Sequence, residues 1–576
     1  MAQDKYEMNH KILAGMLEES YDVLHEFDRS TESAANVNTQ LLMRILNDSK
    51  DTEYGRKYGF GEIHDADEYR RRVPLTTYAD YESYIDRMVN DGEENLLTSY
   101  PIVYYAETSG TSGKPKYIPV SDRGLEVFRN YFSSIILAVI SEFHKTTRLK
   151  DLPDGFKMME LTLSKHSLPC GVNAGAISAA CVKDEDRPLM PFIFANPAEA
   201  MFCTEGANLK YIYSFFALSE RRVNLITGSY IPIILDTVHY IRDNWQSLVS
   251  DIRAGTLSND AVMPDYLCEE LSAKITPNPE RADELEREFA KGFDSTILKR
   301  IWPNLSGIGA IWAGNFSSYA RKLQKFTGMS VPYYTIVYAA SEGVYGTARH
   351  PFDQCYVMIP GSCFFEFIPA NSIEEDCPAT VLFDGVQEGK DYELVITNQS
   401  GFYRYRTGDV IRVIGFYNEA PMVVFKYRTK TVASISGEKF TEDDLASAVR
   451  EFERRTGISV VDFCMYADRS TDPGRYVIIM EPDEEVPKSR MKELVDIMEQ
   501  ELIRTNDNYA YLPHLSEDGG STSIGKPRLI FLQPQTFQLY RDVRMYKTGI
   551  TENQLKTIRF LDKSEIIKFF TALEAK

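Results

Sequence analysis

Residues 107–119 read ETSGTSGKPKYIP, a stretch dense in glycine, hydroxyl side chains and lysine. Glycines let backbone N–H groups approach phosphate oxygens closely, and hydroxyls and lysines add donors and positive charge. The pattern is not the P-loop G-x-x-x-x-G-K-[ST], because Thr108 stands where the first glycine belongs and Pro115 follows the lysine. These residues predict a phosphate-binding loop of another kind; the alternative is a solvated turn rich in glycine and hydroxyls.

Two later turns carry residue types that would complete a nucleotide site. YAASEG occupies residues 338–343, and YRYRTGD occupies residues 403–409. Together with TSGTSGKPK, and in this order, they resemble the motifs of the adenylate-forming superfamily of acyl-CoA synthetases, luciferases and nonribosomal adenylation domains. Taken alone, each segment has a purely structural alternative: its polar residues could belong to an ordinary turn, or its aspartate could cap a turn. Their ordered combination favours the superfamily.

The resemblance implies a role for each residue of the later turns. Tyr338 would pack on adenine, and Ser341 would bind an α-phosphate oxygen. Glu342 would hold Mg²⁺, a cation that takes few protein ligands. Asp409 offers two acceptor oxygens, which suit the 2′- and 3′-hydroxyls of a ribose.

Longer stretches are similar to the GH3 acyl acid amido synthetases, a family known from plant auxin and jasmonate conjugation. The similarity runs from about residue 70 to about residue 560. It is carried by residues 73–113, 195–230, 244–258, 385–431 and 551–559. The last of these, TENQLKTIR, resembles the C-terminal N-Q-Y-K-x-P-R segment of the family.

This second resemblance implies a two-step ligase that uses ATP and Mg²⁺. A carboxylate attacks the α-phosphorus of ATP, giving an acyl-adenylate and pyrophosphate, and an amine, typically of an amino acid, then displaces AMP. Lys116 and the loop amides would hold the β- and γ-phosphates. The catalytic residues would be Lys556, swinging in on a C-terminal domain, and Glu342, the Mg²⁺ ligand. The residues expected to bind ATP or AMP are Thr108, Ser109, Gly110, Thr111, Ser112, Gly113, Lys116, Tyr338, Ser341, Asp409 and Arg428.

The chain also departs from the plant family's pattern. The loop is one residue shorter, Ala340 stands where a serine is commoner, and Ile558 replaces a proline. Residues 436–445, SGEKFTEDDL, resemble the segment that follows the hinge in acyl-CoA synthetases. We therefore expect a distant, non-plant member whose substrates need not be plant hormones.

Two other functions stay open from the sequence. An acyl-CoA or acyl-carrier thioester ligase would carry out the same first half-reaction. In that case, the lysines and serines of the hinge region would bind a CoA phosphate. A protein of this fold could also bind nucleotide or acyl ligand without turnover, although the motif residues argue against that reading. An acyl pocket is expected between residues 195–203 and the turn at 338–341. The aromatic residues expected to line it are Phe202, Tyr211, Tyr213, Phe215 and Tyr338, for which the alternative is core packing.

Composition limits the partners and the compartment. The chain has 576 residues and a formal net charge of −20, so an extended basic surface for nucleic acid is not expected. Its N-terminus lacks the apolar segment of a secretory signal, and its apolar runs are too short to span a bilayer. Its eight cysteines form no C-x-x-C pair. We expect a cytoplasmic monomer with small-molecule acid and amine substrates.

The pattern of helices and strands predicts an α/β fold. We expect a large adenylate-forming N-terminal domain over residues 1–428, with β-sheets and helices as in firefly luciferase and a helical region over about 1–50. Short apolar runs between helical segments indicate its sheets. A hinge over 429–435 would lead to a smaller, mobile α+β domain over 436–576.

Overall fold

The computed structural model describes residues 2–575 except 110–114, 147–154, 161–162, 204–205, 259–260, 295, 313–315, 336, 430–432, 434, 436–439, 472, 507–508, 510–523, 549–554 and 556. The chain forms two compact units. The first contains residues 1–407 and 411–424, and the second contains 408–410 and 425–576. Their boundary therefore falls within two neighbouring strands, β14 (Tyr405–Tyr417) and β15 (Ala420–Arg428).

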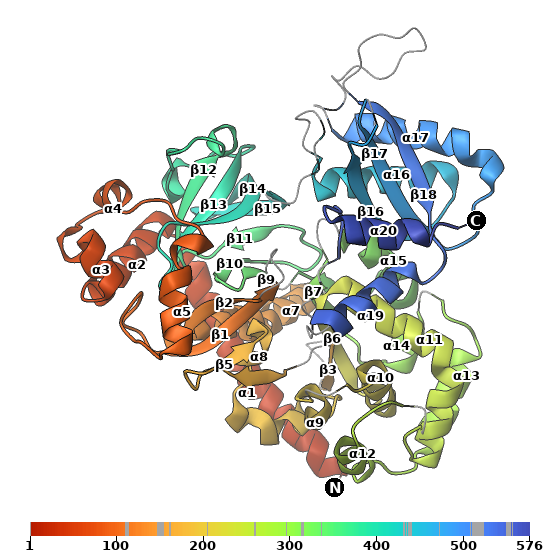
Figure 1. Cartoon of the computed structure of the whole chain (residues 1–576). Coiled ribbons are helices and arrows are strands. Elements are labelled where there is room, and N and C mark those ends of the chain that lie inside the picture. The colour runs from red at the N-terminus through yellow and green to blue at the C-terminus, as the bar shows by residue number, and fades with distance from the viewer. Residues whose placement is uncertain are drawn as a thin grey trace. The chain divides into compact units, whose positions relative to one another are not determined.

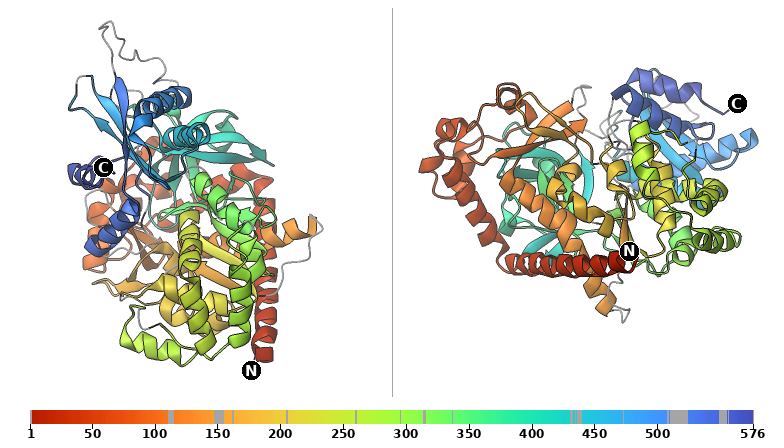
Figure 2. Two further views of the ribbon diagram at one scale, coloured as in Figure 1. Left: turned by 90° about the vertical axis from the view of Figure 1, so that its right-hand side faces the viewer. Right: turned by 90° about the horizontal axis from the view of Figure 1, so that it is seen from below.

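Two helices, α1 (Ala2–Thr31) and α2 (Ala34–Ser49), occupy the N-terminal region expected to be helical. Figure 2 shows α1, in red, as a long straight helix. Apolar residues of α2 at helical spacing, including Leu42 and Ile45, are buried in the core of the first unit. Asn38 of α2 donates from Nδ2 to the carbonyls of Pro360 and Cys363, which ties the helix to a distant part of the chain.

Three sheets form the frame of the first unit (Figure 1). A four-stranded sheet has the order β2-β1-β5-β4, and a second has the all-parallel order β3-β6-β7-β8. The third, of seven strands, has the order β12-β13-β14-β15-β11-β10-β9. The strands of the first two sheets are β1 (Ile102–Ser109), β2 (Pro115–Ser121), β3 (Phe156–Glu160), β4 (Lys165–Ser167), β5 (Asn173–Gly175), β6 (Val223–Tyr230), β7 (Gly307–Ile311) and β8 (Tyr333–Tyr334). Those of the third, besides β14 and β15, are β9 (Val337–Ala340), β10 (Gly343–Thr347), β11 (Tyr356–Met358), β12 (Phe364–Pro369) and β13 (Asp391–Thr397).

Helices accompany these sheets, as an α/β fold requires. The longest after α1 is α11 (Ile231–Ala254), which ends at Gly255 in the left-handed conformation that glycine adopts without strain. The others of the first unit are α3 (Glu53–Tyr58), α4 (Ala66–Arg72), α5 (Glu82–Asn90), α6 (Asp122–Phe128), α7 (Ile135–Thr146), α8 (Ile177–Cys181), α9 (Ala198–Met201), α10 (Leu209–Ser219), α12 (Asp265–Ser272), α13 (Pro279–Phe289), α14 (Ile297–Ile301) and α15 (Ser317–Thr327).

One apolar run behaves differently from a single strand. Within PYYTIVYA (residues 332–339), β8 (Tyr333–Tyr334) belongs to the parallel sheet, whereas β9, which starts at Val337, belongs to the seven-stranded sheet. A continuous apolar run cannot show where a chain leaves one sheet for the next. The turn that follows β9 carries Ser341 and Glu342.

The second unit is a three-stranded sheet with helices on both faces. Its strands are β16 (Val460–Asp468), β17 (Arg475–Pro482) and β18 (Gly525–Phe531), in that order. Alternate side chains divide between two cores, so that Ile478 packs with α16 (Glu442–Thr456) and α17 (Met491–Thr505). Ile479 packs on the other face with α19 (Thr536–Thr548) and α20 (Ser564–Ala572).

Over the described ranges, the chain contains no helix with the length and hydrophobicity needed to cross a bilayer. Within the same ranges, no group of three or more histidine, cysteine, aspartate or glutamate side chains is gathered around a potential metal site.

Candidate active site

The glycine- and hydroxyl-rich loop connects the two strands of a hairpin. Strands β1 and β2 pair antiparallel, with Thr108 opposite Lys116 and Ser109 opposite Pro115. The loop therefore follows directly after a strand, β1. Ser109 is the last residue of β1, whereas Gly110, Thr111, Ser112 and Gly113 lie outside the described residues. Their role as a phosphate cradle stays a prediction.

Lys116 extends from this hairpin toward an aromatic ring that the sequence did not single out. Its Nζ lies 4.6 Å from the centroid of the Tyr78 ring, a cation–π distance. The Tyr78 hydroxyl donates to the carbonyl of Tyr117 at 3.2 Å, which fixes the ring against β2. Burial raises the pKa of Tyr78 to about 12, and the carboxylate of Glu342 adds to the shift. Tyr78 therefore contacts Lys116 through its ring, and its pKa is affected electrostatically by Glu342.

Glu342 lies in the tight turn between β9 and β10, where Ala340 pairs with Gly343. Its Oε1 accepts a hydrogen bond from the Tyr405 hydroxyl at 3.0 Å. Its backbone carbonyl accepts one from Nδ2 of Asn398 at 2.7 Å. The structure thus brings Lys116 and Glu342 into one region of the first unit, and adds Tyr78, Tyr405 and Asn398 to it.

Tyr338, the predicted adenine-binding residue, is buried among other tyrosines of the same sheet. Its ring meets that of Tyr345 edge-on at 5.2 Å and that of Tyr356 at 5.6 Å. Only 7% of Tyr338 is exposed, so any contact with adenine would involve a small part of the ring. Ser341 follows in the turn, directly before Glu342.

Asp409 is paired with Arg428 in the second unit. Nε of Arg428 donates to Oδ1 of Asp409 at 2.6 Å, and Asp409 is 2% exposed. Gly408 precedes it with φ +75°, and a Cβ there would lie 3.1 Å from Oγ1 of Thr429. Because L side chains rarely adopt that backbone conformation, the backbone at this position of the YRTGD motif favours glycine. Sequence reasoning named both residues of the pair but not their contact.

Lys556 lies outside the described residues, but the segment that follows it is firmly anchored. Arg559 is 2% exposed, and its Nη1 donates to Oδ1 of Asp462 and to the carbonyl of Phe463, both at 2.6 Å. Its guanidinium also lies 4.0 Å from the centroid of the Phe463 ring. The C-terminal motif therefore carries, besides the predicted catalytic lysine, an arginine that fixes the segment to β16.

The aromatic residues expected to line an acyl pocket are divided between two hydrophobic clusters. Tyr211, Tyr213 and Phe215 lie on α10 and are buried in the core around the parallel sheet, with Phe202 at its edge. Tyr338 belongs to a different core cluster. The Tyr211 hydroxyl donates to Asp251 at 2.9 Å and accepts from the backbone N–H of Ser258. The three aromatic residues of α10 therefore pack in the hydrophobic core, which is the alternative given above.

The chain matches models of all three domains of one protein family, in order. They are the GH3 family N-terminal domain over residues 23–332, the central domain over 356–428 and the C-terminal domain over 443–565. The first range includes the loop, the second Asp409 and Arg428, and the third Lys556. Glu342 lies between the first two.

Individual relatives match over nearly the whole length. Indole-3-acetic acid-amido synthetase GH3.5 of Arabidopsis thaliana is 29% identical over 95% of this chain and 92% of its own. The 4-substituted benzoates–glutamate ligase GH3.12 of the same plant is 27% identical over 96% of this chain and 99% of its own. A solved structure, that of the GH3.15 acyl acid amido synthetase, aligns with a TM-score of 0.83 and 27% identity over 96% of each chain.

Proposed function

Because this chain belongs to the GH3 family, we propose that it is an ATP-dependent amido synthetase that joins a carboxylic acid to the amine of an amino acid. The observation that carries the proposal is the match of nearly the whole chain to amido synthetases. Lys116 and Glu342 both act on Tyr78, the first by a cation–π contact and the second by an electrostatic effect on its pKa. The relatives act on aromatic acids, as the names indole-3-acetic acid and 4-substituted benzoates indicate. We propose a carboxylic acid of this kind as the acyl substrate.

In the first step, a carboxylate oxygen attacks the α-phosphorus of ATP while the bond to the pyrophosphate oxygen breaks. Lys116 and the loop amides hold the negative β- and γ-phosphates, and Asp409 holds the ribose. Lys556 approaches the carboxylate and the α-phosphate, where negative charge develops. The contribution of these residues is positioning and charge stabilisation, which supply most of the catalysis in reactions at phosphorus.

In the second step, the amine nitrogen attacks the carbonyl carbon of the acyl-adenylate. The bond between that carbon and the phosphate oxygen breaks, AMP leaves, and the nitrogen loses a proton. The products are an amide and AMP. One acid is consumed and one ATP is split for each amide formed.

The residues around Glu342 fit a divalent cation. Tyr405 occupies one position on Oε1, and Glu342 forms no ion pair with another described residue. The carboxylate therefore offers a second oxygen to a hard cation, and Mg²⁺ commonly takes only one or two carboxylates together with substrate phosphates. When bound, Mg²⁺ would neutralise part of the phosphate charge. A cytoplasmic location and a monomeric state complete the proposal.

The proposal is tested by carboxylate-dependent exchange of labelled pyrophosphate into ATP, with aryl, indolyl and aliphatic acids as substrates. We expect exchange with one class of acid, and its loss in the variants Lys116→Ala and Lys556→Ala. The variant Lys547→Ala serves as a control, because Lys547 lies near the end of α19 outside the family motif. Tight ATP binding with no exchange for any acid would contradict the proposal.

A further inference from the structure

We propose that Tyr405 is a positioning residue, which orients the carboxylate of Glu342 toward a divalent cation. This inference rests on the proposed function, in which Glu342 is the metal ligand. The two residues lie 63 positions apart in the sequence, and the distance from the Tyr405 hydroxyl to Oε1 is 3.0 Å. No charged side chain of the described residues shares the carboxylate with Tyr405.

A second side chain holds the backbone of the same glutamate. Nδ2 of Asn398 donates to the Glu342 carbonyl at 2.7 Å. Oδ1 of Asn398 accepts from the backbone N–H groups of Ser400 and Phe402, both at 3.0 Å. The amide is therefore held at both ends, and Glu342 is fixed at its main chain by Asn398 and at its side chain by Tyr405.

Tyr405 has little freedom of its own. It is 8% exposed, and its ring packs against that of Phe402 at 4.8 Å and that of Tyr81 at 6.4 Å. The residues on either side of it bond to Thr76, whose N–H donates to the carbonyl of Arg404 and whose carbonyl accepts from Arg406. A hydroxyl so constrained can keep its hydrogen bond at little further entropic cost.

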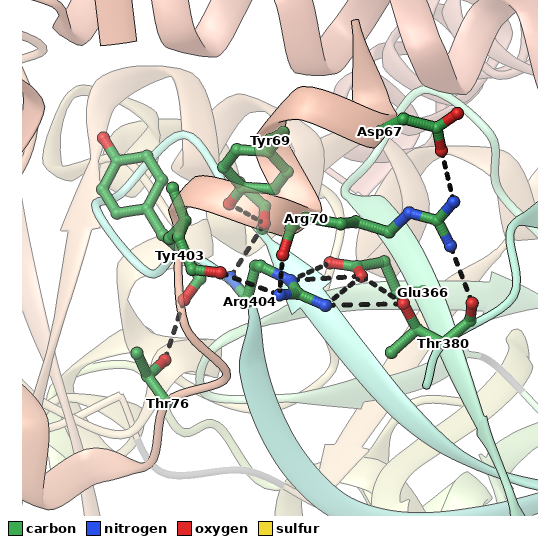
Figure 3. A network of polar contacts seen from close by, with 10 residues as sticks. Asp67, Tyr69, Arg70, Thr76, Glu366, Thr380, Tyr403 and Arg404 are labelled. Carbon is green, nitrogen blue, oxygen red and sulfur yellow. Dashed lines mark hydrogen bonds and ion pairs between the residues drawn. The ribbon is translucent and has the colours of Figure 1, made fainter. Parts of the chain in front are cut away.

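The network of polar contacts in Figure 3 fixes the start of strand β14 at this point. Arg404, with φ +48°, adopts a backbone conformation that costs a non-glycine residue energy. Its guanidinium contacts Glu366 at 2.8 Å and the carbonyls of Val73 and Arg70 at 2.7 and 2.8 Å. Both members of the Arg404–Glu366 ion pair are buried, at 7% and 1% exposure of their side chains. The network thus holds the strained residue that immediately precedes Tyr405.

A neutral donor suits a metal ligand better than a cationic one. A lysine or arginine on Glu342 would cancel the charge that attracts the cation. A phenol fixes the rotamer and occupies one lone pair, while the carboxylate remains an anion. Hydrogen-bonded partners of this kind orient ligands in metal sites generally.

The test is a titration of Mn²⁺ into the full-length protein with a non-hydrolysable ATP analogue, followed by electron paramagnetic resonance of free Mn²⁺. In Tyr405→Phe, which keeps the ring and its packing, we expect the dissociation constant for Mn²⁺ to rise about tenfold. Affinity for the analogue without metal should stay unchanged. Tyr333→Phe is the matched control, since it also removes a buried hydroxyl, bonded at 2.9 Å to Oγ1 of Thr327.

Wild-type Mn²⁺ affinity in Tyr405→Phe would overturn the positioning role. The variant Glu342→Gln, in the same titration, separates this failure from failure of the proposed function. If Glu342→Gln loses Mn²⁺ while Tyr405→Phe does not, Glu342 remains the ligand and only the role of Tyr405 is wrong. If Glu342→Gln binds Mn²⁺ normally, both assignments fail.

Discussion

Nε of Arg428 lies 2.6 Å from Oδ1 of Asp409, so the predicted ribose-binding carboxylate is held by an arginine 19 residues later in the chain. The carboxylate is almost fully buried, at 3% exposure, whereas the arginine side chain is 36% exposed. The arginine both compensates the buried charge and sets the direction of the carboxylate. We therefore predict that Arg428 acts on the nucleotide through Asp409.

Replacing Arg428 should weaken ATP binding. In Arg428→Gln, we expect the KM for ATP in the exchange reaction to rise about tenfold, because Asp409 loses a charged hydrogen bond that orients it. Arg412→Gln is a matched control on β14, the strand that carries Asp409, since Arg412 also pairs with an aspartate, Asp391, at 2.6 Å. Equal effects of the two variants on KM would contradict the role of Arg428.

The ion pair between Arg559 and Asp462 should stabilise the second unit. Arg559→Leu leaves Asp462 buried without its partner, and we expect the free energy of unfolding to fall by about 3–5 kcal/mol. Urea denaturation followed by fluorescence measures this change. Arg454→Leu, which breaks an exposed pair with Glu451, should cost less than about 1 kcal/mol. A stability loss in Arg559→Leu no larger than in Arg454→Leu would refute this interpretation.

Tyr78 should contribute to the position of Lys116. In Tyr78→Leu the lysine loses its aromatic partner, and we expect the KM for ATP to rise about threefold to fivefold, while Tyr78→Phe keeps most of the wild-type affinity. Exchange kinetics at varied ATP concentration measure the effect. Tyr21→Leu removes a similar contact with Lys145, at 5.1 Å, and should leave the KM unchanged. An unchanged KM in Tyr78→Leu would show that the ring has no such role.

Lys157 should make stability depend on pH. This lysine of β3 is 8% exposed, and burial lowers its pKa from 10.5 to about 8. The folded state therefore releases the proton near pH 8 and the unfolded state near pH 10.5, so stability should rise with pH between these values. Below pH 8 the buried charge costs up to about 3 kcal/mol.

Lys157→Met should remove this cost. We expect the variant to be more stable than wild type at pH 7 and to lose the rise in stability between pH 8 and pH 10.5. Thermal unfolding at a series of pH values measures both effects. Lys291→Met, at a side chain that is 57% exposed, should behave like the wild type. A wild-type pH profile in Lys157→Met would contradict the assignment.

Local patterns predicted the α/β class and named the candidate site residues. The helical N-terminal region, the turn with Glu342 and the α+β character of the second unit could be predicted, because each depends on neighbouring residues. The contacts that position these groups were not. Tyr405 and Glu342 are 63 residues apart, and Asp462 and Arg559 are 97 apart, so no spacing rule connects them. The placement of β8 and β9 in different sheets could not be predicted for a similar reason, since sheet membership depends on distant partners.

The most direct test of amide formation is mass spectrometry of a reaction that contains ATP, Mg²⁺, the acid that supports exchange, a mixture of amino acids, and CoA. We expect an acyl–amino acid amide to accumulate with one AMP for each amide, and no acyl-CoA. Formation of the thioester without the amide would contradict the proposed function and assign the protein to the thiol ligases of the superfamily.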